Sequence, residues 1–184
     1  MARKINVAQV VYDIDNMGGA ENVAINAANF ISKNNSSYII SLESQYGNNK
    51  NSTDVKYHSL SKSKGLTFLN LISLIIFVRN NKIKILHAHN LKPLMLSIFS
   101  SFFIKGLKVI FHDHNSINKH QWGRFYRYIC KKYVDSWICV SNEIKISAKK
   151  FVDEEKLYFV NNPVDTDKYY FNKNERDNHL QRFA

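Results

Sequence analysis

Residues 5–31, INVAQVVYDIDNMGGAENVAINAANFI, decide the fold of this chain. Residues 5–12 are almost continuously apolar, which is typical of a strand buried on both faces of a parallel sheet. From Ala20 onward the apolar residues recur every three or four positions, which predicts a helix with one buried face. A polar loop and two glycines separate the two patterns, so the segment predicts a strand, a turn and a helix in that order.

Gly18 and Gly19 stand where the predicted helix begins. Backbone N–H groups and the positive end of the helix dipole meet at such a point, and both favour an anion. Glycine also lets a ligand come close to the backbone. The sequence MGGAEN does not match the G-x-G-x-x-G pattern of dinucleotide-binding turns. Two interpretations therefore stay open, an anion site or a tight turn that needs glycine for its backbone angles.

Strands and helices alternate through the rest of the chain. Apolar runs predict strands at 38–42, 55–59, 83–88, 107–112, 136–140 and 157–160. Helical patterns occupy 65–80, 92–104, 121–134 and 142–151. This alternation predicts an α/β fold, a Rossmann-like and mostly parallel sheet with right-handed crossovers and helices on both faces.

The composition narrows the class of protein. The net charge of +11 points to an anionic partner such as phosphate, nucleic acid or a membrane surface. No nucleic-acid-binding motif accompanies the charge, so we expect no nucleic-acid partner. Cys130 and Cys139 lack C-x-x-C spacing and predict reduced, buried thiols in a cytoplasmic protein. The apolar runs 66–78 and 94–104 are too short to span a bilayer, so we expect buried core helices there.

Two histidine pairs end neighbouring predicted strands, His87 with His89 and His112 with His114. Residues two apart on a strand share a face, so each pair can present two imidazoles together. We favour His112 as an imidazole that faces a developing negative charge in a reaction. Solvated or hydrogen-bonded side chains at strand ends remain the alternative for His87, His114 and His120.

The same pairs raise the question of a metal site. Pairs of the form H-x-H, here with Asp113 beside them, ligate zinc in some hydrolases. We expect no metal, because no acidic cluster accompanies the first pair and strand alternation can break where a loop begins. Stoichiometric zinc in an elemental analysis would instead favour a metal-dependent hydrolase.

Five motifs follow one another in an order that is known from one family. They are GGAE at 18–21, ILHAHN at 85–90, VIFHDHN at 109–115, DSWICVSN at 135–142 and FVNNPVD at 159–165. With this set the chain resembles the N-terminal half of a GT-B glycosyltransferase of family 4. The resemblance implies two Rossmann-like domains with the active site between them, an acceptor-binding N-terminal domain and a C-terminal domain that binds the nucleotide-sugar and carries E-x7-E. It also implies transfer that retains the anomeric configuration and needs no metal or other cofactor.

The resemblance assigns roles to residues of this chain. Gly18 and Gly19 would approach the donor diphosphate, and His112 matches the histidine near the transferred sugar. The residues implied on the acceptor side are Asn16, Glu21, His89 and Asn90. The partners implied are a nucleotide-sugar and a saccharide or lipid-linked acceptor, in the synthesis of a cell-surface polysaccharide.

The family's second domain does not appear in this sequence. We therefore expect residues 1–171 to form one N-terminal domain and the polar residues 172–184 to begin a linker toward a missing half. The isolated chain is then expected to be inactive. The alternative is a non-catalytic binding module, or half of a split transferase, that recruits a separate catalytic chain. An E-x7-E domain in the reading frame downstream would settle this point.

Residues 119–133, KHQWGRFYRYICKKY, are basic and aromatic and contain no acidic residue. Their helical spacing gives one apolar face, expected to pack on the core, formed by Trp122, Phe125, Tyr126, Ile129, Cys130 and Tyr133. Arg124, Arg127 and Lys131 line another face. Because family 4 enzymes often use lipid-linked acceptors, we expect this basic face to contact an anionic membrane surface. The protein would then be cytoplasmic and peripheral on the inner face of the cell membrane.

Overall fold

A computed structural model describes residues 4–16, 18–43, 54–60, 68–114 and 124–162. The predicted polar tail at 172–184, His120 and Trp122 lie outside these residues. Within them the predicted alternation of strands and helices is confirmed. Ser141 caps the last α-helix by accepting a hydrogen bond from the Ile144 N–H at 3.3 Å. That helix ends at Ala148 rather than at the predicted residue 151.

The described strands form one seven-stranded sheet in which every pairing is parallel. The spatial order is β3-β2-β1-β4-β5-β6-β7. The strands are β1 (Asn6–Val11), β2 (Ser36–Ser41), β3 (Val55–Ser59), β4 (Ile85–His89), β5 (Lys108–Asp113), β6 (Ser136–Cys139) and β7 (Leu157–Phe159). This is the predicted Rossmann-like α/β fold, and it brings the carboxyl ends of all the strands to one edge.

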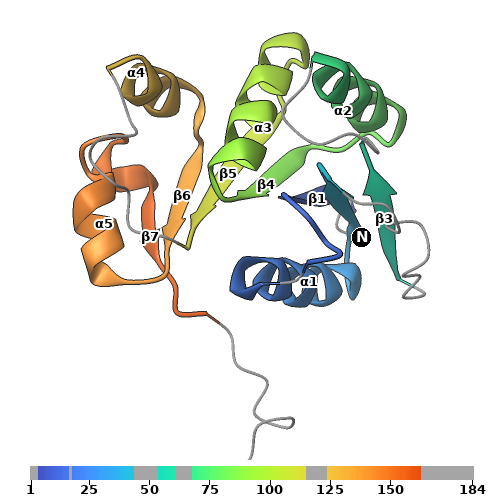
Figure 1. Cartoon of the computed structure of the whole chain (residues 1–184), viewed down its shortest axis with the longest axis horizontal. Helices are drawn as coiled ribbons and strands as arrows, with labels where there is room; N and C mark the ends of the chain where they lie inside the picture. The colour runs from blue at the N-terminus through green and yellow to red at the C-terminus, as the bar shows by residue number, and fades with distance from the viewer. Residues whose placement is uncertain (1–3, 17, 44–53, 61–67, 115–123, 163–184) are drawn as a thin grey trace, which may run out of the picture.

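In the described part of the chain, five α-helices cover the two faces of the sheet unequally (Figure 1). They are α1 (Gly19–Ser32), α2 (Phe68–Asn80), α3 (Leu91–Phe103), α4 (Arg124–Tyr133) and α5 (Asn142–Ala148). Side chains of α3, α4 and α5 share one apolar cluster with Phe111 and Trp137, and α2 packs beside α3 on the same face. The opposite face is packed by α1, through Ala24 and Ala28 against β1 and β2. Among the described residues, no other helix packs on that second face.

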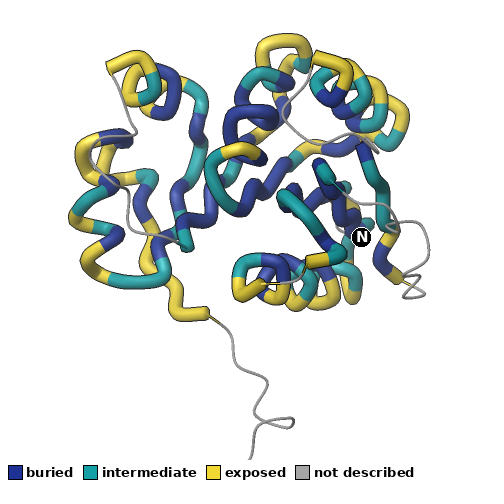
Figure 2. The backbone as a smooth tube through the Cα atoms, viewed as in Figure 1, coloured by how far each residue is buried: buried dark blue, intermediate teal, exposed yellow. Residues whose placement is uncertain are grey.

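The two apolar runs that we expected to be core helices differ in burial. The helix α3 is buried along most of its length, in agreement with the expectation. The expectation is wrong for α2, because Phe68, Leu69 and Ile76 are more than half exposed. Figure 2 shows α2 mostly in the colours of exposed and half-buried residues. The reason is the position of α2, which among the described residues packs on the sheet and on α3 through Leu74 and Val78. No described helix combines the length and the hydropathy needed to cross a bilayer.

Both cysteines are buried free thiols, as the sequence predicts. Burial raises the pKa of Cys130 and of Cys139 to about 12, so neither thiol ionises near neutral pH. Neither residue offers a reactive thiolate for a chemical role.

Candidate functional site

The candidate site lies where the strand order reverses. From β1 the chain adds β2 and β3 on one side, and from β4 it adds β5, β6 and β7 on the other. The strands β1 and β4 are hydrogen-bonded neighbours, with Gln9 opposite His87. In open α/β sheets ligands bind beyond the carboxyl ends of strands at such a switch point. The polar residues that end β1, β4 and β5 are therefore the first candidates for binding or catalysis.

Four imidazoles gather at this point. In the pairing of β4 with β5, His89 stands opposite His112. Because side chains alternate along a strand, His87, His89, His112 and His114 all lie on the same face of the sheet. The ring centroids of His112 and His114 are 4.3 Å apart, and those of His87 and His89 are 4.6 Å apart. The sequence left open whether the alternation breaks at the strand ends, and the pairing of β4 with β5 extends to His89 and His112.

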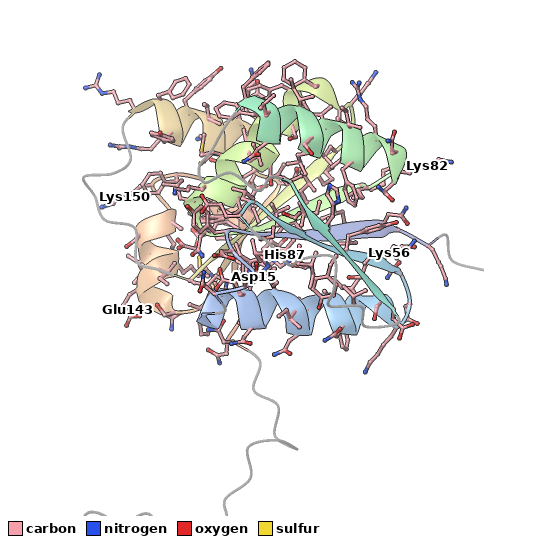
Figure 3. All side chains as sticks on the ribbon, turned by 45° about the vertical axis from the view of Figure 1, so that its right-hand side comes forward. Asp15, Lys56, Lys82, His87, Glu143 and Lys150 are labelled. Atoms are coloured by element: carbon pink, nitrogen blue, oxygen red, sulfur yellow. The ribbon has the colours of Figure 1, made fainter. Side chains whose placement is uncertain are left out.

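The face that carries the histidines is the one on which α1 packs. Gln9 is two residues from Val11, and Val11 packs against Ala24 and Ala28 of α1. Gln9 is opposite His87 in the register, so the imidazoles continue the same face beyond α1. Figure 3 shows His87 inside the molecule, between the sheet and α1. The cluster is therefore interior to the fold but lies beside the part of the face that no described helix covers.

A hydrogen-bonded chain fixes the protonation of one imidazole. His89 Nε2 lies 2.8 Å from Gln9 Oε1, and His89 Nδ1 lies 3.0 Å from His114 Nε2. The amide oxygen of Gln9 can only accept, so His89 Nε2 carries the proton and its Nδ1 holds a lone pair. His114 Nε2 must then be the donor to His89 Nδ1. Gln9 was not predicted as a site residue. A polar residue inside an otherwise apolar, buried strand was the signal that could have identified it as one.

The cluster is uncharged at neutral pH. Burial, with a smaller effect from the neighbouring imidazoles, lowers the pKa of His87 to about 4 and that of His112 to about 3. Burial also lowers the pKa of His114 to about 4 and holds that of His89 well below its ordinary value. Four protonated rings at this separation would repel one another in a poorly solvated place. Each imidazole therefore offers one N–H and one lone pair.

Two of these imidazoles are not satisfied by their surroundings. Within the described part of the chain, His87 Nε2 and both ring nitrogens of His112 are buried without a hydrogen-bond partner. The alternative of a hydrogen-bonded side chain is confirmed for His114, which bonds to His89, whereas His87 is buried and its Nε2 has no partner among the described residues. Leaving such groups unpaired in the interior costs about 1–3 kcal/mol each. Proteins keep groups of this kind mainly where they serve a ligand or a reaction.

The structure contradicts one of the two interpretations of the Gly18–Gly19 turn, namely that it needs glycine for its backbone angles. Neither Gly18 nor Gly19 has a positive φ, so the turn does not need glycine for its backbone angles. The N–H of Gly18 donates to Glu21 Oε2 at 3.1 Å. The carboxylate of Glu21, predicted on the acceptor side, therefore caps the helix in this structure. A Cβ at Gly18 would lie 3.1 Å from that carboxylate, whereas a Cβ at Gly19 would meet no atom within 4 Å.

The open space at Gly19 gives a clean test of the anion interpretation. We expect Gly19→Val to keep the fold and the melting temperature, because a Cβ there meets no atom of the described residues within 4 Å. In an enzyme completed by a nucleotide-binding domain, the same variant should weaken donor binding, because the side chain covers first-turn N–H groups that can bind a phosphate. Calorimetric titration with the donor measures the effect, and Asn26→Val, at an exposed position of the same helix, is the control for a β-branched side chain on α1. Unchanged donor affinity in Gly19→Val would mean that the turn is only structural.

Two other predicted residues take up local roles at the same edge. Asn16 donates from Nδ2 to Asp13 Oδ2 at 2.6 Å, and Asp13 Oδ1 also accepts from the Asp15 N–H at 2.9 Å. Asn90 begins α3 with φ 72° and ψ 170°. This region of backbone space is populated almost only by glycine, and it costs a non-glycine residue about 1–3 kcal/mol. Strain beside the histidine cluster is consistent with a functional position for Asn90.

A second set of interacting polar side chains lies at this edge and was not predicted from the sequence. Lys92 Nζ donates to Tyr12 Oη at 2.9 Å and lies 4.2 Å from the centre of the Tyr12 ring. The Tyr12 hydroxyl in turn donates to Glu43 Oε1 at 2.5 Å. This group ties the ends of β1 and β2 to the first turn of α3. The residues are far apart in sequence, so no local pattern could have brought them together.

The predicted basic face of α4 is exposed, but one of its cations is paired and the apolar face of the helix is narrower than predicted. Arg124, Arg127 and Lys131 are all exposed, but Lys131 Nζ forms a 2.9 Å ion pair with Asp153. Phe125 was predicted on the apolar face that packs on the core, and this was wrong, since it is 63% exposed. The buried side of α4 is narrower and is formed by Ile129 and Cys130. An exposed aromatic residue thus accompanies the cations.

Solved structures show what the fold is similar to. Anabaena HepE, determined in complex with UDP and glucose, has a TM-score of 0.75 at 13% identity over 97% of this chain and 50% of its own. The lipopolysaccharide outer core galactosyltransferase WaaB in its apo form has a TM-score of 0.64 at 16% identity, over 87% of this chain and 46% of its own. UDP-N-acetylglucosamine 2-epimerase from Rickettsia bellii has a TM-score of 0.64 at 9% identity, over 87% of this chain and 45% of its own. At these identities the likeness shows the fold alone, a GT-B half.

The chain spans about half the length of these solved structures. A search of curated protein sequences finds no significant match. The model of the family described as Glycosyltransferase Family 4 matches residues 17–168. The chain therefore belongs to glycosyltransferase family 4.

Proposed function

We propose that this chain is the acceptor-binding half of a retaining sugar transferase. It would act in the transfer of a sugar from a nucleotide-sugar to a saccharide or lipid-linked acceptor, in the synthesis of a cell-surface polysaccharide. The observation that carries the proposal is the family match over residues 17–168, together with the polar edge at the reversal of strand order. The same edge holds the Gly18–Gly19 turn and His112, the two features to which the family resemblance gives roles.

The state of His112 supports a role in the chemical step. The ring is neutral and buried, and its two nitrogens are not used by the described residues. A neutral imidazole can donate one N–H to an oxygen on which negative charge develops, without introducing a charge of its own. Such a donor acts more strongly in a poorly solvated place than in water, because little solvent competes with it.

The donor would be shared between two domains. HepE was determined with UDP and glucose, and it is about twice as long as the part that this chain matches. We infer that a second domain binds the nucleotide, while the helix N-terminus at Gly19 of this chain contributes to the diphosphate. That domain could be continuous with this chain or a separate polypeptide. In the second case, the chain would be half of a split transferase.

The decisive experiment compares this chain alone with this chain plus the C-terminal domain of a family 4 relative. Each preparation is incubated with a set of nucleotide-sugars and saccharide or lipid-linked acceptors, and released nucleotide is measured. We expect release that depends on acceptor only when both domains are present. Turnover by the isolated chain would contradict its assignment as an incomplete enzyme. Stable association of the two domains without turnover would favour the alternative, a binding module.

We also infer that the chain works at the cytoplasmic side of a membrane as a peripheral protein. The helices α2, α3 and α4 lie on one face and contain no acidic residue. They expose the aromatic residues Phe68, Phe102 and Phe125 together with the cations of α4. Apolar side chains beside positive charge fit an anionic leaflet, where the acceptor of a lipid-linked sugar transferase would reside.

A further inference from the structure

The candidate site contains more histidines than a sugar transferase of this kind requires. A single imidazole suffices for the contact with the transferred sugar, yet this fold brings four to the same place. Three of them, His87, His89 and His112, are buried, and one ligand atom from each lies within 4.8 Å of the others. The arrangement therefore needs an explanation of its own.

The convergence follows from the sheet and does not depend on a loop. His87 and His89 stand on β4, and His112 stands on β5 in register with His89. Both strands are central, with hydrogen-bonded neighbours on each side. Side chains on paired central strands are held in position more firmly than side chains on loops. The three imidazoles are thus preorganised by backbone pairing.

The protonation of these rings suits a metal ion. Metal ligation needs neutral imidazole, and burial keeps these rings neutral. His89 shows the arrangement typical of a metal ligand, with one nitrogen donating to a carbonyl-type oxygen of Gln9 and the other holding a lone pair. The lone pair on His89 Nδ1 now accepts from His114, which is only partly buried and can turn toward solvent.

We propose that His87, His89 and His112 form a binding site for a divalent transition-metal ion of the zinc class. Three imidazole nitrogens, with a fourth position left for water or an anion, are an established zinc ligand set. Nitrogens bound to one tetrahedral zinc lie about 3.3 Å apart, so an inward shift of at most about 1.5 Å between two rings closes the site. Imidazole ligands without a carboxylate disfavour Mg²⁺ and Ca²⁺, which prefer oxygen.

Such an ion would have a consequence for the proposed transferase, and this consequence rests on the proposed function. A metal bound to His112 occupies the lone pair of that ring and fixes its orientation. The ring could then no longer turn its N–H toward the transferred sugar. Binding of the metal is therefore expected to lower the rate of the completed enzyme, and a chelator should restore it.

The test measures binding directly on the untagged full chain. The protein is stripped with EDTA, dialysed, and equilibrated with micromolar Zn²⁺, and bound metal is counted by atomic emission. We expect one Zn²⁺ per chain, and a visible spectrum of tetrahedral type when Co²⁺ replaces Zn²⁺. His87→Gln and His89→Gln should lose this binding, and Gln9→Leu should weaken it by about 10-fold, because Gln9 orients His89.

The matched control is His58→Gln, because His58 lies on β3 and stacks on Phe77 outside the cluster. It should bind Zn²⁺ as the wild type does, and circular dichroism checks that each variant is folded. The inference is overturned if the wild type binds no Zn²⁺, if His87→Gln binds as the wild type does, or if His58→Gln loses binding equally. Zinc binding combined with an absence of transfer by the completed enzyme would uphold this inference and contradict the proposed function.

Discussion

Replacing His112 with alanine in the completed two-domain enzyme is expected to lower kcat by about 100-fold or more. The imidazole is proposed to donate a hydrogen bond that strengthens as charge develops in the transition state. Loss of such a contact affects kcat more than KM, because the ground state gains less from it. Initial rates over a range of acceptor concentrations measure the two parameters separately. EDTA in the assay removes any influence of bound metal.

The fold should survive this substitution. Neither ring nitrogen of His112 has a hydrogen-bond partner among the described residues, so alanine leaves no polar group of theirs unpaired. The variant does lose packing against the rings of His87 and His114. We expect a cooperative unfolding transition with a modestly lowered midpoint, and His58→Ala serves as the control for loss of a histidine. Wild-type kcat in folded His112→Ala would remove this residue from the mechanism.

Local patterns in the sequence predicted the fold because each element carries its own periodicity. The run at 5–12 contains β1, and the three-and-four spacing from Ala20 lies within α1. No local pattern of this kind shows which strands pair with each other or in which register. The opposition of His89 to His112 follows only from the register of β4 with β5, so the four imidazoles could be seen as pairs but not as one cluster.

Some contacts of the predicted residues could not be read from the sequence, because a side chain can have more than one partner. Glu21 fits an acceptor contact by resemblance, yet in the folded chain its carboxylate caps the N-terminus of α1. Lys131 fits the basic face of α4, yet Asp153, distant in sequence, pairs with it. The exposure of α2 was missed for a related reason, because composition alone does not tell whether a helix has neighbours on one side or on all sides.

The second prediction with a large expected effect concerns membrane binding by the basic face of α4, defined by Arg124, Arg127 and Lys131. We expect the chain to bind vesicles rich in anionic lipid and to bind neutral vesicles weakly. Each cation near an anionic leaflet contributes about 1 kcal/mol, so three correspond to about 100-fold in binding. Because Lys131 is paired with Asp153, most of this effect should come from Arg124 and Arg127.

Reversal of all three cations to glutamate should therefore abolish binding to anionic vesicles without unfolding the domain. All three side chains are exposed, so the stability cost should be limited to the exposed Lys131–Asp153 pair and the contact of Arg127 with the Phe151 ring. Vesicle co-sedimentation at low and at high salt measures the binding. Salt should weaken it in the wild type, since the charges concerned are exposed and screened by ions.

The control carries the same change in net charge at another place. Lys33, Lys56 and Lys150 are exposed and lie on or next to α1, β3 and α5 (Figure 3 shows Lys56 and Lys150). If overall charge drives binding, reversing these three should weaken it as much as reversing the α4 cations. If the α4 face is the contact, the control variant should retain most of its binding. Equal binding of the wild type to neutral and anionic vesicles, or none to either at low salt, would leave the positive charge of α4 without a membrane role.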